Sequence, residues 1–201
     1  MLVPFARQWG ALVLAVAMLA AASATRAEEV WLSDGAWDAR LGAQDVHLVP
    51  IPVPAERLWQ VAIFVDGRET KRLSVAVSYR LAGVFEFPDR WVLLMANTHG
   101  GYYCHSHYFS TTISKKDGGT EVSPYFTTCG YRNPHVARRA NRLQVGFEKT
   151  FLEADFFEYD LAAGAFVAAE RAFPVSQYAP PADPQTRARA ILPMPQPEAR
   201  Q

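Results

Sequence analysis

Apolar and polar residues alternate along most of the chain with a period of two. The segments 59–65 and 73–81 show this alternation most clearly, and 143–147 repeats it. A period of two is typical of β-strands, because successive side chains of a strand point to opposite faces of a sheet. After residue 27 no segment shows the pattern of a long amphipathic helix. The pattern therefore predicts an all-β protein.

Turn residues separate these segments at the places where hairpins need them. They are Asp66-Gly67, the run 115–119 with the sequence Lys-Lys-Asp-Gly-Gly, and the run 160–164. Asp-Gly pairs readily adopt the positive φ angles of tight hairpin turns. The uninterrupted apolar run 91–96 is typical of a strand that is covered on both faces. We therefore expect a single antiparallel sandwich or barrel-like domain of about nine or ten strands.

Three segments fit the alternation less well. Pro50, Pro52 and Pro54 predict an extended edge or linker, since proline donates no hydrogen bond to a ladder. Gly83 is expected to end the strand that begins at residue 73. We interpret the basic run 132–142 as a solvated connection or short helix, with an anion-binding patch as the functional alternative.

The two cysteines of the chain, Cys104 and Cys129, lie on either side of the turn at 115–119. When the two arms fold back, the cysteines face each other to within about two residues of register, which one bulge absorbs. Directly opposed residues lie roughly 4.5–5.5 Å apart at Cα, within disulfide reach. An exported chain with two cysteines favours such a bond. We therefore predict one cross-strand disulfide.

The alternation within the two arms agrees with this pairing. With the cysteines paired, one face of the hairpin carries Phe109, Ile113, Val122 and Phe126. Tyr125 is then expected on the opposite face, because neighbours on a strand alternate. Pro124 cannot donate to a ladder, so its arm is expected to be an edge strand or to be bulged there.

The first 27 residues have the features of a secretory signal. Arg7 supplies positive charge, the apolar run 11–22 is too short to span a bilayer with ease, and small residues follow it. An uncleaved membrane anchor is the alternative. We assign residues 1–27 to the signal peptide, 28–178 to an all-β domain and 179–201 to a disordered tail rich in Pro and Ala. The protein is therefore expected in the periplasm of a Gram-negative bacterium, or secreted from it.

The charge balance argues against two kinds of partner. The chain has 20 basic and 20 acidic residues, and the loss of Arg7 and Arg26 with the signal leaves a net charge of about −2. A nearly neutral chain is not drawn to nucleic acid or to an anionic membrane by its charge. We expect neither as a partner after signal cleavage.

Three histidines provide the sharpest candidate site. His105 and His107 are two residues apart, so a strand projects both imidazoles to one face, as a Zn²⁺ or Cu²⁺ site requires. His99 precedes them across the glycines at 100 and 101. The same face carries Phe109, which favours a structural, half-buried histidine pair over a metal site. We expect no cofactor, with Zn²⁺ or Cu²⁺ as the alternative.

Four tyrosines flank the predicted disulfide and form a candidate contact surface: Tyr102, Tyr103, Tyr108 and Tyr125. Aromatic side chains are enriched at binding interfaces, although strands favour them as well. The chain has no Gly-x-Ser-x-Gly nucleophile elbow and no phosphate-binding glycine loop. Ser106 lies between two histidines, but neighbours on a strand point to opposite faces. We therefore assign no catalytic residue.

Between residues 90 and 160 the chain combines an apolar strand at 91–96, Gly-Gly-x-x-Cys at 100–104 and a hairpin that returns to Thr128-Cys129. This combination resembles a group of exported proteobacterial β-rich proteins. The segment His105-Ser106-His107 departs from the small or proline-containing segment of that group. The resemblance implies an all-β fold and an exported location, and it implies no activity.

These observations predict an exported, non-catalytic binding or interaction module with an unknown protein or glycan partner. Two alternatives stay open. One is a periplasmic metal-binding protein that uses His105 and His107, and the other is a small hydrolase or lysozyme-inhibitor-like protein. An exposed aromatic patch favours binding, convergent ligands favour metal, and a cleft with coupled titratable groups favours an enzyme.

Overall fold

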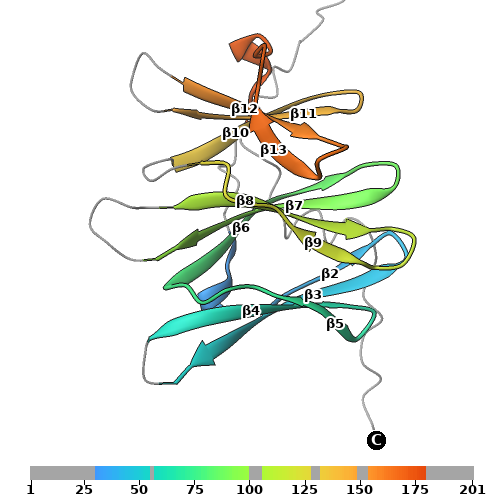
Figure 1. The fold of residues 1–201 in the computed structure, drawn as a ribbon, viewed down its shortest axis with the longest axis vertical. Coiled ribbons are helices and arrows are strands. Elements are labelled where there is room, and N and C mark those ends of the chain that lie inside the picture. The colour runs from blue at the N-terminus through green and yellow to red at the C-terminus, as the bar shows by residue number, and fades with distance from the viewer. Residues whose placement is uncertain (1–29, 55–56, 100–105, 128–131, 149–153, 180–201) are drawn as a thin grey trace, which may run out of the picture.

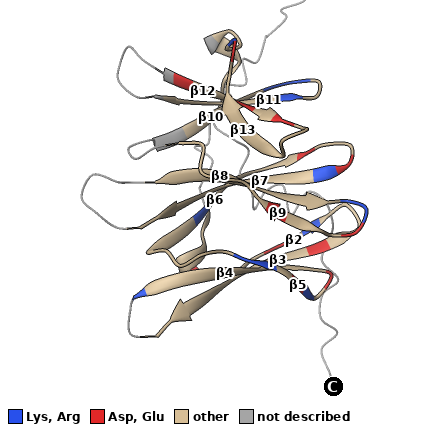
Figure 2. Ribbon diagram, in the orientation of Figure 1, with Lys and Arg blue, Asp and Glu red and all other residues tan. Residues whose placement is uncertain are grey.

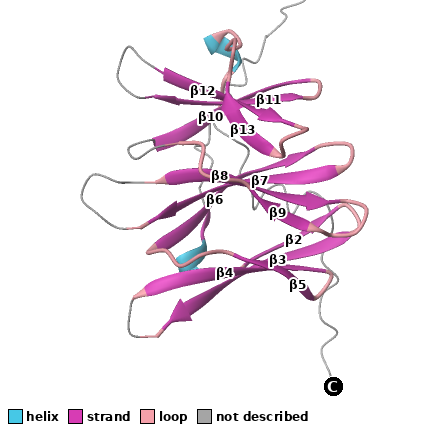
Figure 3. Cartoon of the chain, in the orientation of Figure 1, coloured by secondary structure: helices cyan, strands magenta, loops and turns pink. Residues whose placement is uncertain are grey.

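The computed structural model describes residues 30–54, 57–99, 106–127, 132–148 and 154–179. Within these ranges it contains thirteen β-strands and two 3₁₀ helices of three residues, η1 (Leu32–Asp34) and η2 (Val175–Gln177), and no α-helix (Figure 3). The all-β prediction is confirmed. The expected nine or ten strands are too few, because short edge strands such as β1 (Val30–Trp31) and β9 (Thr120–Val122) are too brief to show an alternation.

The strands form three antiparallel sheets that are stacked face to face (Figure 1). The N-terminal sheet has the order β2 (Trp37–Leu41), β3 (Gln44–Val53), β4 (Leu58–Val65), β5 (Arg68–Arg72). The central sheet has the order β1, β6 (Ser78–Glu86), β7 (Arg90–Thr98), β8 (His107–Ser114), β9. The C-terminal sheet has the order β10 (Arg132–Arg139), β11 (Arg142–Glu148), β12 (Ala154–Asp160), β13 (Ala165–Ala168).

The central sheet buries both of its faces, so the molecule has two hydrophobic cores. On β7, Leu93 and Met95 point into the core that is shared with the N-terminal sheet. Their neighbours Val92 and Leu94 point into the core that is shared with the C-terminal sheet. Alternate side chains of β7 therefore contribute to the two different cores. The prediction that residues 91–96 form a strand covered on both faces is confirmed.

The turn at Asp66-Gly67 joins β4 to β5 as predicted. Both residues have positive φ angles, 51° and 75°, which match the twist of a tight hairpin. The single strand expected at 73–81 is wrong, because the chain leaves the N-terminal sheet after Arg72 and enters the central sheet as β6. Between the two, Ala76 exchanges two backbone hydrogen bonds with Trp59.

Two further expectations about local structure are corrected. Gly83 does not end a strand, since β6 runs through it with a register irregularity between Leu81 and Gly83. The basic run 132–142 is neither a solvated connection nor a helix, because most of it forms β10, which pairs with β11. The expectation of an extended edge near the prolines is confirmed. Beyond Leu48, β2 no longer pairs with β3, so Pro50 and Pro52 lie on an edge of the sheet.

The hairpin of β8 and β9 has the turn that the sequence predicts, and its ladder pairs Thr111 with Val122. The same register continues to the hydrogen bond from the Ser123 amide to the Ser110 carbonyl. The next bond, to the Tyr108 carbonyl, comes from Phe126 instead of residue 125. One extra residue is therefore inserted beside Pro124, as the missing N–H of proline predicts.

This insertion reverses the faces of the residues after Pro124. Phe126 does not lie beside Phe109 and Ile113, as expected, but packs against Phe147 and Phe166 in the core of the C-terminal sheet. Val122 precedes the insertion and does pack on the core of Phe109 and Ile113.

Several predictions concern residues outside the described ranges. These are the signal at 1–27, residues 180–201 of the predicted disordered tail, the disulfide between Cys104 and Cys129, and the site residues Tyr102, Tyr103 and His105. They stay predictions. Ala179, the first residue assigned to that tail, instead exchanges two backbone hydrogen bonds with Val136 on β10. No helix in the described part of the chain is long and apolar enough to cross a membrane.

Candidate functional site

One end of the central sheet gathers polar and aromatic side chains from adjacent strands. Asn97 on β7 pairs with Tyr79 on β6 and with His107 on β8, so the three lie in a row across the sheet. Asn97 is two residues beyond Met95, and His107 is two before Phe109. Both therefore face the side of the N-terminal sheet, where Met95 and Phe109 are buried.

His99, His107 and Tyr125 form a triangle of rings at this end, which we call the ring cluster. The ring centroids of the two histidines are 5.8 Å apart. The Tyr125 centroid lies 6.0 Å from that of His99 and 5.2 Å from that of His107. His99 Nε2 lies 3.1 Å from the Tyr125 hydroxyl oxygen, which is hydrogen-bond distance.

The ring cluster rests on a rigid base. Asn97 is 2% exposed, and its Nδ2 donates to the Tyr125 hydroxyl oxygen at 2.7 Å. The Tyr125 ring also meets Phe109 edge to face, with centroids 5.7 Å apart and an angle of 78° between the planes. A buried amide and a buried ring therefore hold Tyr125 in one orientation, because each restricts a different motion of the phenol.

Tyr79 is a further buried residue that supports the ring cluster. Its hydroxyl donates to the Ser74 carbonyl, and its ring meets Phe109 edge to face. Burial raises the pKa of Tyr79, although the hydrogen bonds with Ser74 and Asn97 act in the opposite direction. Tyr79 is therefore a neutral structural phenol that supports the cluster from within the core.

One side of the ring cluster is exposed to solvent. Tyr125 is 44% exposed, His99 is exposed and His107 is half-buried. Val77, which is 38% exposed, donates its backbone N–H to the Thr98 carbonyl and so lies near His99, where β6 begins and β7 ends. An apolar side chain thus extends the exposed rings into a patch.

The structure brings together three of the residues that the sequence singled out and excludes a fourth. His99 and His107 were candidate metal ligands, and Tyr125 was a candidate contact residue. Tyr108, however, is fully buried against Phe147, with centroids 4.7 Å apart, and so lies outside any contact surface. No group of three or more His, Cys, Asp or Glu side chains among the described residues could hold a metal ion.

Arg80 is a buried charged residue that sequence reasoning missed. It is 9% exposed, and its guanidinium lies between the rings of Trp31 and Tyr108, at 5.3 and 5.4 Å from their centroids. It donates to the Tyr108 hydroxyl and, at 3.3 Å, to Ser106 Oγ. In the sequence, Arg80 stands out as a positively charged residue within an apolar, alternating strand. Its stacked position makes it a structural element of the core edge.

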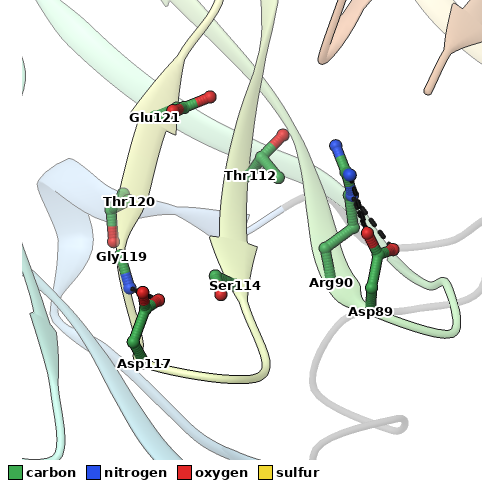
Figure 4. Close-up of a pocket in the computed structure, with 8 residues that line it drawn as sticks. All are labelled: Asp89, Arg90, Thr112, Ser114, Asp117, Gly119, Thr120 and Glu121. Carbon is green, nitrogen blue, oxygen red and sulfur yellow. Dashed lines mark hydrogen bonds and ion pairs between the residues drawn. The ribbon is translucent and has the colours of Figure 1, made fainter. Parts of the chain in front are cut away.

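A polar hollow of about 400 Å³ lies near the turn of β8 and β9, at the opposite end of these strands from the ring cluster (Figure 4). Figure 4 shows Asp89 and Arg90 turned toward each other, and they form an ion pair of 2.7 Å. Arg90 lowers the pKa of Asp89, and the Gly119 amide lowers that of Asp117 by donating to it at 3.0 Å. The carboxylates of Asp89 and Asp117 in this hollow are therefore already occupied by interactions that stabilise turns.

A second hollow, of about 500 Å³, lies on the C-terminal sheet around an ion pair. Arg142 donates to both oxygens of Glu158, at 2.5 and 2.6 Å, and Gln144 donates to one of them at 2.8 Å. Arg142 lowers the pKa of Glu158 and the bond from Gln144 acts in the same direction, against burial. Gln144 also accepts from Tyr178, so the group holds the chain after β13.

Glu158→Gln should remove part of the acid sensitivity of the fold. A lowered pKa in the folded state stabilises the protein above the unfolded carboxyl value of about 4.3, and that contribution is lost as pH falls. We expect wild type to lose about 0.5–1 kcal/mol more than the variant between pH 6 and pH 3 in urea unfolding. The control Glu170→Gln, an exposed residue of the same hollow, should keep the wild-type profile. Identical profiles for wild type and Glu158→Gln would contradict the assignment.

Charged residues lie mainly at turns and strand ends, with both signs interspersed (Figure 2). Comparison of the chain with protein-family models, with curated proteins and with solved structures found no match. The site must therefore be interpreted from its own geometry, and in that geometry the ring cluster combines exposed rings with a rigid base.

Proposed function

We propose that the protein is an exported, non-catalytic binding module, and that its contact surface is the ring cluster with Val77. The single observation that carries this proposal is the exposed phenol of Tyr125 held by the buried amide of Asn97 at 2.7 Å. Tyrosine is favoured at contacts because it offers a large apolar face and a polar tip. Tyr125 is 44% exposed, and its hydroxyl is positioned by Asn97 and His99.

The restricted motion of the side chains in the ring cluster favours binding there. Ordering a flexible side chain on association costs roughly 0.5–1.5 kcal/mol, and a side chain that is already fixed avoids much of it. The Tyr125 side chain is fixed by Asn97 and Phe109, and the backbone of His107 is fixed by the ladder of β7 and β8. The surface is therefore organised before a partner arrives.

The chemistry of the surface suits a protein or glycan partner. Exposed ring faces stack on apolar side chains or on the C–H face of a sugar, and the imidazole and hydroxyl groups supply hydrogen bonds. Export to the periplasm, as the first 27 residues predict, would place this surface among such partners.

Site-specific photo-crosslinking in cells tests the proposal. A photoreactive phenylalanine analogue is placed at position 125, and in a matched variant at Leu161, which is 37% exposed on the turn between β12 and β13. We expect discrete adducts at position 125 that are absent at position 161. Their masses before and after glycosidase treatment then separate a protein partner from a glycan. Adducts that are absent at 125, or identical at both positions, would refute the contact surface.

A further inference from the structure

The geometry points to a divalent transition-metal site formed by His99, His107 and Tyr125. The inference concerns the same ring cluster as the proposed function and adds a ligand of stated chemistry to it. It differs from the site that the sequence predicts, because the phenol of Tyr125 joins two of the three predicted histidines and His105 is not required.

The spacing of the donor groups fits one ion. Ligand atoms at about 2.0–2.1 Å from a tetrahedral ion lie roughly 3.3 Å from one another. His99 Nε2 and the Tyr125 hydroxyl oxygen are 3.1 Å apart, close to that separation. The His107 ring completes the triangle, with its centroid 5.8 Å from that of His99 and 5.2 Å from that of Tyr125. The three rings therefore border one common space, toward which His99 Nε2 and the Tyr125 hydroxyl already converge.

The donor set selects a class of metal. Imidazole nitrogen suits Zn²⁺ and Cu²⁺, and an N,O set with open positions suits Cu²⁺ best of the divalent series. On binding, the ion replaces the proton between His99 Nε2 and the phenol of Tyr125. That proton leaves to water, and the phenol becomes a phenolate ligand. No electron is transferred in this step, so no oxidant or reductant is needed.

The groups around the donors have the features of a supporting shell. Asn97 donates an N–H to the Tyr125 oxygen, and a donated N–H stabilises negative charge there. Asn97 and His107 are paired on β7 and β8, so His107 and the residue that holds Tyr125 stand on one sheet, and His99 directly follows the end of β7. Attachment to a rigid element limits how far a ligand can move from its position.

The experiment is a metal titration of the full mature chain, freed of metal by chelator and returned to chelator-free buffer. Copper(II) sulfate and zinc sulfate are added separately and followed by calorimetry, and the copper form is examined by electron paramagnetic resonance. We expect one equivalent of each ion to bind, with Cu²⁺ tighter than Zn²⁺. The copper spectrum should show coupling to two imidazole nitrogens, and a phenolate-to-copper charge-transfer band should appear in the visible range.

Three variants separate this site from adventitious binding. His99→Ala removes an exposed ligand and should weaken Cu²⁺ binding at least tenfold. Tyr125→Phe keeps the ring, should abolish the charge-transfer band and should also weaken binding. His47→Ala, a control histidine paired with Asp38 in the N-terminal sheet, should leave affinity and spectrum unchanged. Thermal melts without metal show whether each variant is folded.

The experiments distinguish failure of the metal site from failure of the contact surface. The metal site is overturned if no stoichiometric ion binds, or if His99→Ala and Tyr125→Phe leave affinity and spectrum unchanged. In either case, specific adducts at position 125 would still support the contact surface. Conversely, a two-imidazole copper spectrum without specific adducts would support the metal site and refute the contact surface.

Discussion

Replacing Phe147 by alanine should lower the free energy of unfolding by about 3–5 kcal/mol. Phe147 on β11 is fully buried at the centre of the core between the central and C-terminal sheets. Its ring lies 4.7 Å from that of Tyr108 on the central sheet and 6.0 Å from that of Phe157 on β12. Alanine would leave a cavity that neighbours on two sheets cannot fill, because strand pairing holds both sheets in place.

Urea unfolding followed by circular dichroism measures this change. The control is Val167→Ala on β13 of the same sheet, which is 45% exposed and should alter stability by no more than about 0.5 kcal/mol. Both proteins should unfold in one transition, because β6, β7 and β8 contribute to both cores. A loss below about 1 kcal/mol for Phe147→Ala, or a separate transition for the C-terminal sheet, would show that the third layer is not packed in this way.

Gly118→Ala should destabilise the protein by about 2–4 kcal/mol, from two additive causes. Gly118 has a φ of +71°, in the left-handed region where a Cβ is strained. A Cβ there would also lie 2.9 Å from Val65 Cγ1, on the neighbouring sheet. The turn of β8 and β9 would have to move away from the N-terminal sheet, which removes contacts between the two layers.

Gly67→Ala is the matched control for this substitution. Gly67 has a similar φ of +75°, but nothing lies within 4 Å of a Cβ at that position. It should therefore show the backbone strain alone, about 1 kcal/mol. The difference between the two variants, measured by chemical unfolding, isolates the clash with Val65. Equal losses would show that the turn yields freely and that the two layers are not in tight contact there.

Local features of this fold follow directly from the sequence. Asp66-Gly67 and the run 115–119 determine two hairpin turns, because few residues tolerate the positive φ angles that such turns need. The continuous apolar run 91–96 determines that β7 is buried on both sides. These features depend on residues that are close in the chain, so a local pattern is enough to predict them.

The number and stacking of the sheets depend on contacts between distant residues. The alternation at 73–81 looks like one strand, yet the chain changes sheets within it. Ala76 still pairs with Trp59 of the N-terminal sheet, and Ser78 begins β6 of the central sheet. The run 132–142 has little apolar character, yet most of it forms β10 because β11 offers it a ladder. An apolar residue indicates that its side chain is buried, but it does not indicate which sheet covers it.

The same distinction applies to the candidate site. Spacing in the sequence placed His107 on the face of Phe109 and indicated His99 as its neighbour, and the structure brings the two rings together. The sequence placed Tyr125 on the opposite face, where it could not have met either histidine. The inserted residue beside Pro124 turns Tyr125 onto the histidine face, because proline donates no N–H and the ladder resumes one residue later. Both faces of β8 are buried, so hydrophobicity alone could not have revealed that shift, and only the tertiary structure decided it.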